Sequence, residues 1–188
     1  MKEHELYLIM SPPTEIRKKN IELIEQLISE DYFVIVITTN QPYDILKKNY
    51  EKNGIPIERI HFVDTVTKYA MGGDPPPVKK CWFISNPANL TDIGIAVTET
   101  LKGLEGKKVC LLFDSVSSML IYMSSQNITR FIHFITTKLR LLNFAGIFLV
   151  AENGLDPDVL VQLTTFVDAV IDVDKLTVDR KDLTGSLS

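Results

Sequence analysis

The chain has 188 residues, of which 45% are hydrophobic, and these values are typical of one compact domain with a sizeable core. Its formal net charge is −4 and its pI is about 5.4, so a general attraction to the phosphate backbone of a nucleic acid is excluded. Two cysteines, Cys81 and Cys110, are too few for a structural zinc site and favour buried, reduced thiols over a disulfide.

No stretch of the sequence is apolar for long enough to cross a membrane. The longest apolar run, residues 144–151, falls far short of the ~20 residues that a membrane helix requires. We therefore expect a soluble, cytoplasmic protein that has no membrane partner.

Apolar runs alternate along the chain with segments of helical periodicity. The runs predicted to be strands are residues 6–10, 33–38, 60–63, 82–85, 109–113, 147–150 and 167–173. The segments predicted to be helices are about 15–30, 42–53, 91–104, 127–142 and 156–165. Thr14 suits the N-cap of the first helix, and Gly54 suits the end of the second.

The repeated strand–helix–strand order predicts the fold class. It indicates a three-layer α/β/α domain over residues 1–173, with a mostly parallel sheet and helices on both faces. Residues 174–188 are polar and lose periodicity, so we expect a loosely held tail there. Ligands of such sheets bind outside the carboxyl ends of the strands, which directs attention to the loops that follow them.

Asp114 ends the predicted strand 109–113, where a nucleotide-hydrolysing α/β protein keeps the carboxylate of its magnesium site. The glycine loop that should accompany this carboxylate is missing, because the first strand is followed by Ser11-Pro-Pro-Thr-Glu-Ile-Arg-Lys-Lys-Asn20. This stretch contains no glycine, and its two prolines have no N–H to donate to a phosphate. One half of an ATPase site is therefore present without the other half.

The order and spacing of several motifs resemble the KaiC branch of the RecA-like ATPases over nearly the whole chain. The motifs are Asp114-Ser115 after its strand, Ser118 to Tyr122, Phe131 to Arg140, Leu155 to Asp158, and Phe166 to Ile171. Within that branch, the stretches Thr39 to Tyr43, His61 to Thr65 and Asn89 to Gly94 are similar to an archaeal group that is generally regarded as having lost ATPase activity. The resemblance implies a RecA-like P-loop NTPase fold without a P-loop.

The chain departs from an active member of that branch in ways that bear on mechanism. Ser11 to Lys18 replace the glycine cradle, and their cations supply charge but no oriented amides. Asn40 and Gln41 stand where active relatives place acids, and neither can accept a proton from water at neutral pH. Asp114 remains, but one carboxylate without nucleotide phosphates holds magnesium weakly. We therefore expect no catalysis, no bound metal and no cofactor.

A remnant nucleotide site is nevertheless predicted, and it consists of Thr14, Arg17, Lys18, Asn40, Gln41, Asp114 and Ser115. In the alternative interpretation this is an unusual phosphate site that binds ATP and magnesium with slow or no hydrolysis. A third interpretation is a small-ligand sensor that reuses the same crevice. For Asp114 the simplest expected role is to cap backbone N–H groups of the loop 115–118, and residues 40–42 are equally compatible with an ordinary strand-to-helix turn.

The predicted helix 127–142 is more apolar than one core face requires. Its stripe consists of Ile128, Phe131, Ile132, Ile135, Leu139 and Leu142, and Phe134 and Leu141 widen that stripe. The helix is either central and well covered, or part of a subunit contact. We expect an inactivated domain that acts as a regulatory or protein-interaction module, with a protein partner that the sequence does not identify, in a homodimer or another homo-oligomer and without a nucleic-acid partner.

Overall fold

A computed structural model describes residues 4–173, so the tail expected over 174–188 lies outside the described residues. The strands are β1 (Leu6–Ser11), β2 (Phe33–Thr38), β3 (Ile60–Asp64), β4 (Cys81–Phe83), β5 (Val109–Asp114), β6 (Ala145–Ala151) and β7 (Ala169–Asp172). They form one 7-stranded sheet in the order β4-β3-β2-β5-β6-β1-β7. Every pairing in it is parallel, which confirms the predicted fold class.

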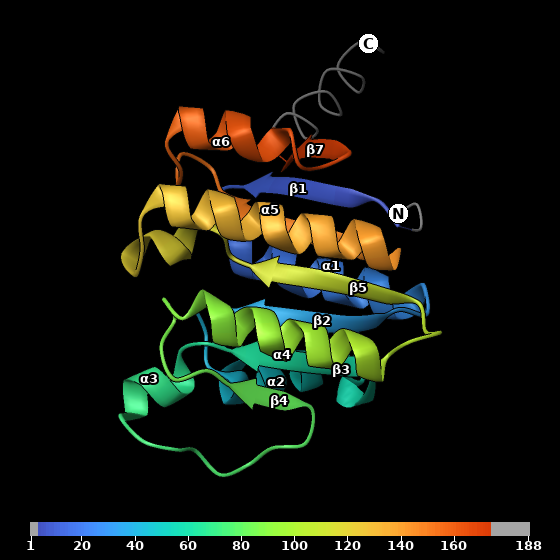
Figure 1. Ribbon diagram of the computed structural model, residues 1–188. Coiled ribbons are helices and arrows are strands. Elements are labelled where there is room, and N and C mark those ends of the chain that lie inside the picture. Colours follow the sequence, from blue (N-terminus) through green and yellow to red (C-terminus); the bar gives the residue numbers. More distant parts are fainter. Residues whose placement is uncertain (1–3, 174–188) are drawn as a thin grey trace, which may run out of the picture.

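Helices cover both faces of this sheet (Figure 1). They are α1 (Ile16–Ser29), α2 (Tyr43–Lys52), α3 (Thr67–Met71), α4 (Leu90–Gly103), α5 (Ser125–Leu142) and α6 (Pro157–Thr164), with short 3-10 helices η1 (Ile57–Arg59) and η2 (Ser117–Ile121). The apolar sides of α1 and α2 pack in one core on one face of the sheet, and those of α4, α5 and α6 pack in a second core on the other. The three short elements α3, η1 and η2 were not predicted from the sequence.

The amino-acid composition of the central strands explains their burial. All six residues of β5 are buried, as are all residues of β2 after Phe33, because a parallel strand under helices is covered on both faces. Gly54 has φ +71° just after α2, which confirms the predicted helix end. The predicted N-cap was wrong: α1 begins at Ile16 with Glu15 as its N-cap, because the Glu15 N–H already donates to the carbonyl of Pro12 at 2.9 Å.

The strand order reverses between β2 and β5. From β2 the chain continues to β3 and β4 on one side, whereas β6 and β7 lie on the other side, beyond β5. Thr38 and Asp114, the last residues of β2 and β5, are register partners in the sheet. This pair therefore marks the topological switch point, where the crevice of an α/β sheet opens at the carboxyl ends of the strands.

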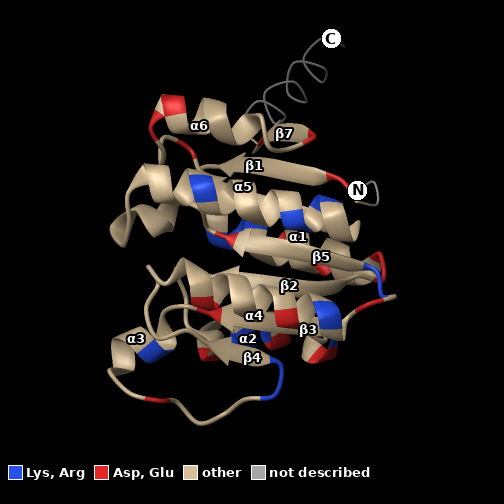
Figure 2. Ribbon diagram, in the orientation of Figure 1, with Lys and Arg blue, Asp and Glu red and all other residues tan. Residues whose placement is uncertain are grey.

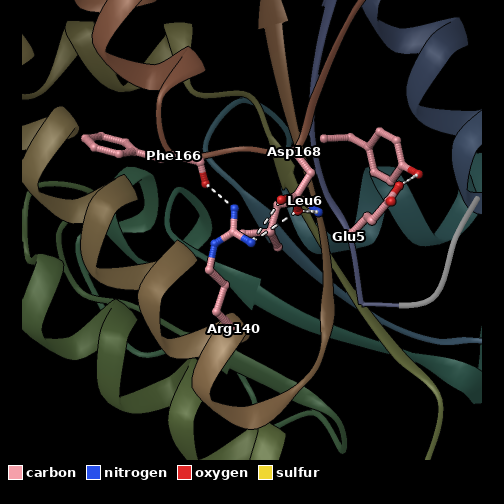
Figure 3. A network of polar contacts seen from close by, with 6 residues as sticks. Glu5, Leu6, Arg140, Phe166 and Asp168 are labelled. Carbon is pink, nitrogen blue, oxygen red and sulfur yellow. Dashed lines mark hydrogen bonds and ion pairs between the residues drawn. The ribbon is translucent and has the colours of Figure 1, made fainter.

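Asp168 joins three elements at the opposite, amino-terminal edge of the sheet (Figure 3). Its carboxylate accepts a hydrogen bond from the backbone N–H of Leu6 at 2.8 Å, and its own N–H donates to the Leu6 carbonyl at 2.8 Å. Arg140, near the end of α5, donates to Asp168 Oδ1 at 3.0 Å and to the carbonyl of Phe166 at 3.2 Å. Asp168 therefore fixes the start of β1 and the approach to β7 against α5.

Cys81 and Cys110 are both free, and burial raises the pKa of each thiol, as expected for reduced, unreactive cysteines. No helix within residues 4–173 has the length and apolar character needed to span a bilayer.

Candidate functional site

Asp114 is buried at the carboxyl end of β5, with 4% of the residue exposed. Its Oδ2 accepts a hydrogen bond of 2.8 Å from the side-chain amide of Asn20 on α1. Burial raises the pKa of Asp114 to about 6, and the hydrogen bond from Asn20 and the positive charge of Arg17 offset part of that rise. The carboxyl group is thus held by an amide rather than by a cation.

A second hydrogen bond extends this contact into α2. The hydroxyl of Tyr50 donates to Asn20 Oδ1 at 2.8 Å, so Tyr50, Asn20 and Asp114 form a continuous chain of side chains from three elements. Tyr50 and Asn20 are 0% and 2% exposed. Burial, and to a smaller extent the charge of Asp114, raises the pKa of Tyr50, which keeps its hydroxyl a donor. The polar side-chain groups of Tyr50, Asn20 and Asp114 therefore serve as one another's hydrogen-bond partners.

The open space beside Asp114 is small. The cavity that it shares with Arg17, Asn20, Gln41 and Tyr50 has a volume of about 20 Å³. A cavity needs at least ~10–15 Å³ to hold one water molecule, so this one has room for about one water. A cavity of this volume is too small for a hydrated magnesium ion.

The expected capping role of Asp114 was wrong. The N–H of Ser115 donates to Thr39 Oγ1 at 3.1 Å, and the N–H of Val116 donates to the carbonyl of Leu149 at 2.9 Å. Thr39 also bonds the Ser115 carbonyl at 2.9 Å and the hydroxyl of Ser118 at 2.6 Å. The loop after β5 is therefore held by Thr39, which the sequence did not single out, and the carboxylate of Asp114 is left for Asn20.

The residues of the predicted remnant site are only partly brought together. Arg17, Gln41 and Asp114 line the same small cavity. Ser115 is buried next to Asp114 but belongs to the Thr39 network. Thr14 and Asn40 are exposed and do not line the cavity, and Lys18 is engaged on the surface of α1 by Glu15 at 3.6 Å and Glu22 at 3.9 Å.

Asp64 holds the neighbouring loops at this edge and was also not singled out from the sequence. It ends β3 with 0% exposure, and its Oδ2 accepts the N–H of Tyr43 at 2.7 Å. Its Oδ1 accepts the N–H groups of Val66 and Thr67, each at 2.8 Å. The carboxylate thus fixes the starts of α2 and α3, which gives it a structural role. Within residues 4–173, no group of three or more histidine, cysteine or acidic side chains is arranged to hold a metal ion.

Two hollows that share Phe134 lie on the helical face of α4 and α5, and together they form a larger open surface. The first, of about 430 Å³, lies between Ile95 of α4 and Phe134 of α5; the second, of about 520 Å³, is lined by α5 alone, with Phe134, Lys138 and Leu141 among its residues. Phe134 is 46% exposed and Leu141 81% exposed. The helix is therefore not fully covered, and Leu142, which was expected in the core stripe, is 46% exposed because α5 ends there.

The chain matches a protein family in sequence and several solved structures in fold. The model of a family of unknown function, DUF7504, matches residues 17–173. No curated protein matches the sequence significantly.

Several solved structures are similar in fold. Uncharacterized protein PH0321 from Pyrococcus horikoshii, crystallised in complex with an unknown peptide, has a TM-score of 0.69 and 17% identity over 92% of this chain and 78% of that chain. The KaiC-like protein PH0186 from the same organism has a TM-score of 0.63 and 13% identity over 92% of this chain and 74% of its own. Flagellar accessory protein FlaH from Methanocaldococcus jannaschii has a TM-score of 0.52 and 15% identity, with coverages of 92% and 72%. At these identities the likeness establishes the KaiC-like, RecA-like fold alone.

Proposed function

We propose that this chain, which belongs to the DUF7504 family of unknown function, is a KaiC-like domain that no longer hydrolyses nucleotides and serves as a protein-interaction module. The observation that carries the proposal is the small volume of the cavity beside Asp114, whose polar side chains are hydrogen-bonded to one another. The carboxyl group of Asp114 is bonded to Asn20, which is bonded to Tyr50, beside a cavity of about 20 Å³.

Hydrolysis of ATP needs parts that these residues do not supply. A P-loop presents successive backbone N–H groups to the phosphates, whereas Pro12 and Pro13 follow β1 here and have none. Magnesium retains several waters when it binds carboxylates and phosphates, and the space beside Asp114 holds about one. Among residues 4–173, Arg17 is the one basic side chain that lines this space, and it contributes a positive charge but no array of backbone N–H groups.

The interaction role is supported by the hollow over α4 and α5. Its two parts, of about 430 and 520 Å³, are within the range of ligand-binding clefts, and Phe134 belongs to both. Exposed bulky apolar side chains that adjoin one another are typical of binding surfaces. PH0321, which is similar in fold, was crystallised with an unknown peptide, and a bound polypeptide segment is the class of ligand that we propose for this chain.

The test is titration of the purified chain with ATP, ADP and magnesium by calorimetry, together with a phosphate-release assay. We expect no heat of nucleotide binding, no turnover above background and no rise in melting temperature. The alternative function, nucleotide binding at Arg17 and Asp114, predicts instead a melting temperature that rises with magnesium and ATP. That rise would have to disappear in both Arg17→Ala and Asp114→Asn, and such a result would refute our proposal.

A further inference from the structure

We propose that the hollow over α4 and α5 binds an amphipathic helix of a partner protein that carries carboxylates four residues before and four residues after a central apolar side chain. We call this hollow the α4–α5 groove, and its defining residues are Ile95, Thr98 and Glu99 of α4 and Phe134, Lys138 and Leu141 of α5. This inference rests on the proposed interaction function and specifies the partner's chemistry.

Phe134 is the centre of the groove. Its ring stacks on that of Phe131, with centroids 6.3 Å apart and planes inclined by 28°. Gly94 lies beneath it: a Cβ atom at that position would come within 3.2 Å of the Phe134 ring, so the absence of a side chain lets the ring lie against α4. Phe134 is thus positioned by both helices while nearly half of it stays exposed, as an apolar anchor of a binding surface requires.

The charges along α5 are of one sign. Its 18 residues include Arg130, Lys138 and Arg140 but no acidic residue (Figure 2). Arg140 is engaged by Asp168, whereas Arg130 and Lys138 have no ion pair within residues 4–173. Lys138 lies with its ammonium group 5.4 Å from the centre of the Phe134 ring. The acid in the groove, Glu99, is already paired with Lys102 at 2.8 Å.

The spacing of these charges defines the partner. Arg130 and Lys138 lie four residues before and four residues after Phe134, so all three lie on one side of α5 and each cation is about one turn from Phe134. A partner helix whose apolar residue covers Phe134 places its own residues at the same spacing opposite these cations. Acidic residues at those two positions of the partner helix are attracted by Arg130 and Lys138, and basic residues there are repelled by them.

The same spacing disfavours a second copy of the chain in this groove. A two-fold contact in which the α5 helices run antiparallel and meet at Phe134 puts Arg130 of one copy opposite Lys138 of the other, twice. Like charges facing each other across an interface oppose association. The charges oppose this antiparallel arrangement of α5, and the homo-oligomer expected through this helix stays a prediction.

The experiment uses a fluorescent synthetic helix of about 18 residues, roughly five turns. It carries a central leucine, leucines three residues to either side, and glutamate four residues to either side, on an alanine and glutamine background. A matched peptide carries lysine in place of both glutamates. Fluorescence anisotropy at low salt should give a dissociation constant about tenfold lower for the glutamate peptide, with a difference that shrinks as salt is added.

Protein variants locate the binding. Lys138→Glu should weaken binding of the glutamate peptide about fivefold or more and strengthen binding of the lysine peptide. Phe134→Ser should weaken both peptides about tenfold, and because the ring is half exposed the variant should stay folded; Leu141→Ser, at an 81% exposed position, provides a second apolar variant. Lys48→Glu makes the same charge change on α2, across the sheet, and should leave both dissociation constants within about twofold.

Three outcomes would overturn the inference. Equal dissociation constants for the two peptides would contradict the role of charge. If Lys48→Glu weakened binding of the glutamate peptide as much as Lys138→Glu does, the binding site would not lie in the α4–α5 groove. Sedimentation that shows a dimer lost in Phe134→Ser would assign the groove to a second copy. None of these results would bear on nucleotide binding, which tests the proposed loss of hydrolysis separately.

Discussion

The side chains of Asn20 and Asp114 are hydrogen-bonded at 2.8 Å at the carboxyl edge of the sheet, although 94 positions separate them in the sequence. Asn20 offers its amide N–H to the carboxyl group and its oxygen to the hydroxyl of Tyr50. The hydrogen-bond donor to the carboxyl group of Asp114 is therefore a neutral amide and not a charged side chain. This contact should affect the free energy of unfolding in ways that can be measured.

Asp114 should make stability fall as the pH rises through the mildly acidic range. Burial raises its pKa from an ordinary value of 3.8 to about 6, so between these values the folded protein holds a proton that the unfolded chain has released. Stability from this group is therefore full below about pH 4 and is lost as the pH rises through about 6, by up to about 3 kcal/mol. Urea denaturation across this range should show that loss in the wild type relative to Asp114→Asn, which cannot ionise. A difference between the two proteins that does not change with pH would contradict this expectation.

Removing Asn20 should cost more than removing the hydroxyl of Tyr50. Asn20→Ala leaves both Asp114 and Tyr50 without their buried partner, and we expect a loss of about 2–4 kcal/mol in the free energy of unfolding. Tyr50→Phe leaves only the Asn20 oxygen unsatisfied and should cost about 1–2 kcal/mol. Tyr69→Phe, at a residue that is 52% exposed, is the control and should have no measurable effect. If Asn20→Ala were as harmless as the control, the hydrogen-bonded chain would not be important for stability.

Asp168 should matter more to stability than Arg140, although the two form an ion pair. The side chain of Arg140 is 45% exposed, so Arg140→Ala should cost about 0–1 kcal/mol. Asp168→Ala also removes the acceptor of the Leu6 N–H, and it should cost about 1–3 kcal/mol. Hydrogen exchange at the Leu6 amide distinguishes the two effects, because it should accelerate strongly only in Asp168→Ala. Lys102→Ala breaks an ion pair of two exposed residues and serves as the control. Equal effects of Asp168→Ala and Arg140→Ala would argue against the role of the Leu6 hydrogen bond.

Two glycine-to-alanine changes should have opposite signs. A Cβ at Gly146, on β6, would come within 2.7 Å of Leu139 and 3.1 Å of Leu6, and both of these side chains are fully buried. Gly146→Ala should therefore destabilise the protein by about 1–3 kcal/mol through overpacking. Gly103, the last residue of α4, has no atom within 4 Å of that position, so Gly103→Ala should stabilise it by about 0.5–1 kcal/mol. Thermal unfolding of both variants checks the prediction, and a stabilised Gly146→Ala would show that the core at β6 has room to relax.

Much of the fold could be predicted from the sequence because its strands are buried on both faces. The bounds of β2 were predicted without error, since an unbroken run such as Phe33–Thr38 has no other stable environment in a small domain. The short helix α3 was missed because five residues are too few to show a period. Its start is fixed instead by Asp64, through a contact with Thr67 that belongs to the folded chain.

The candidate site was predictable only in part, for a related reason. The position of Asp114 at a strand end follows from the local pattern, but its partner lies on α1 and is identified only once the sheet has formed. One signal was available: Asn20 stands within the apolar stripe of α1 and is buried there. A buried amide requires hydrogen-bond partners, so this position should have been paired with a polar group of the sheet.

The place of β1 in the sheet has a consequence for the order in which the chain can fold during synthesis. β1 is made first, yet its two neighbours are β6, which begins at Ala145, and β7, which begins at Ala169. On the ribosome, β2, β3, β4 and β5 can pair as they emerge, while β1 remains an unpaired apolar strand until most of the chain has been translated. We therefore expect residues 6–11 to be a segment of the nascent protein that is prone to aggregation until β6 has been translated.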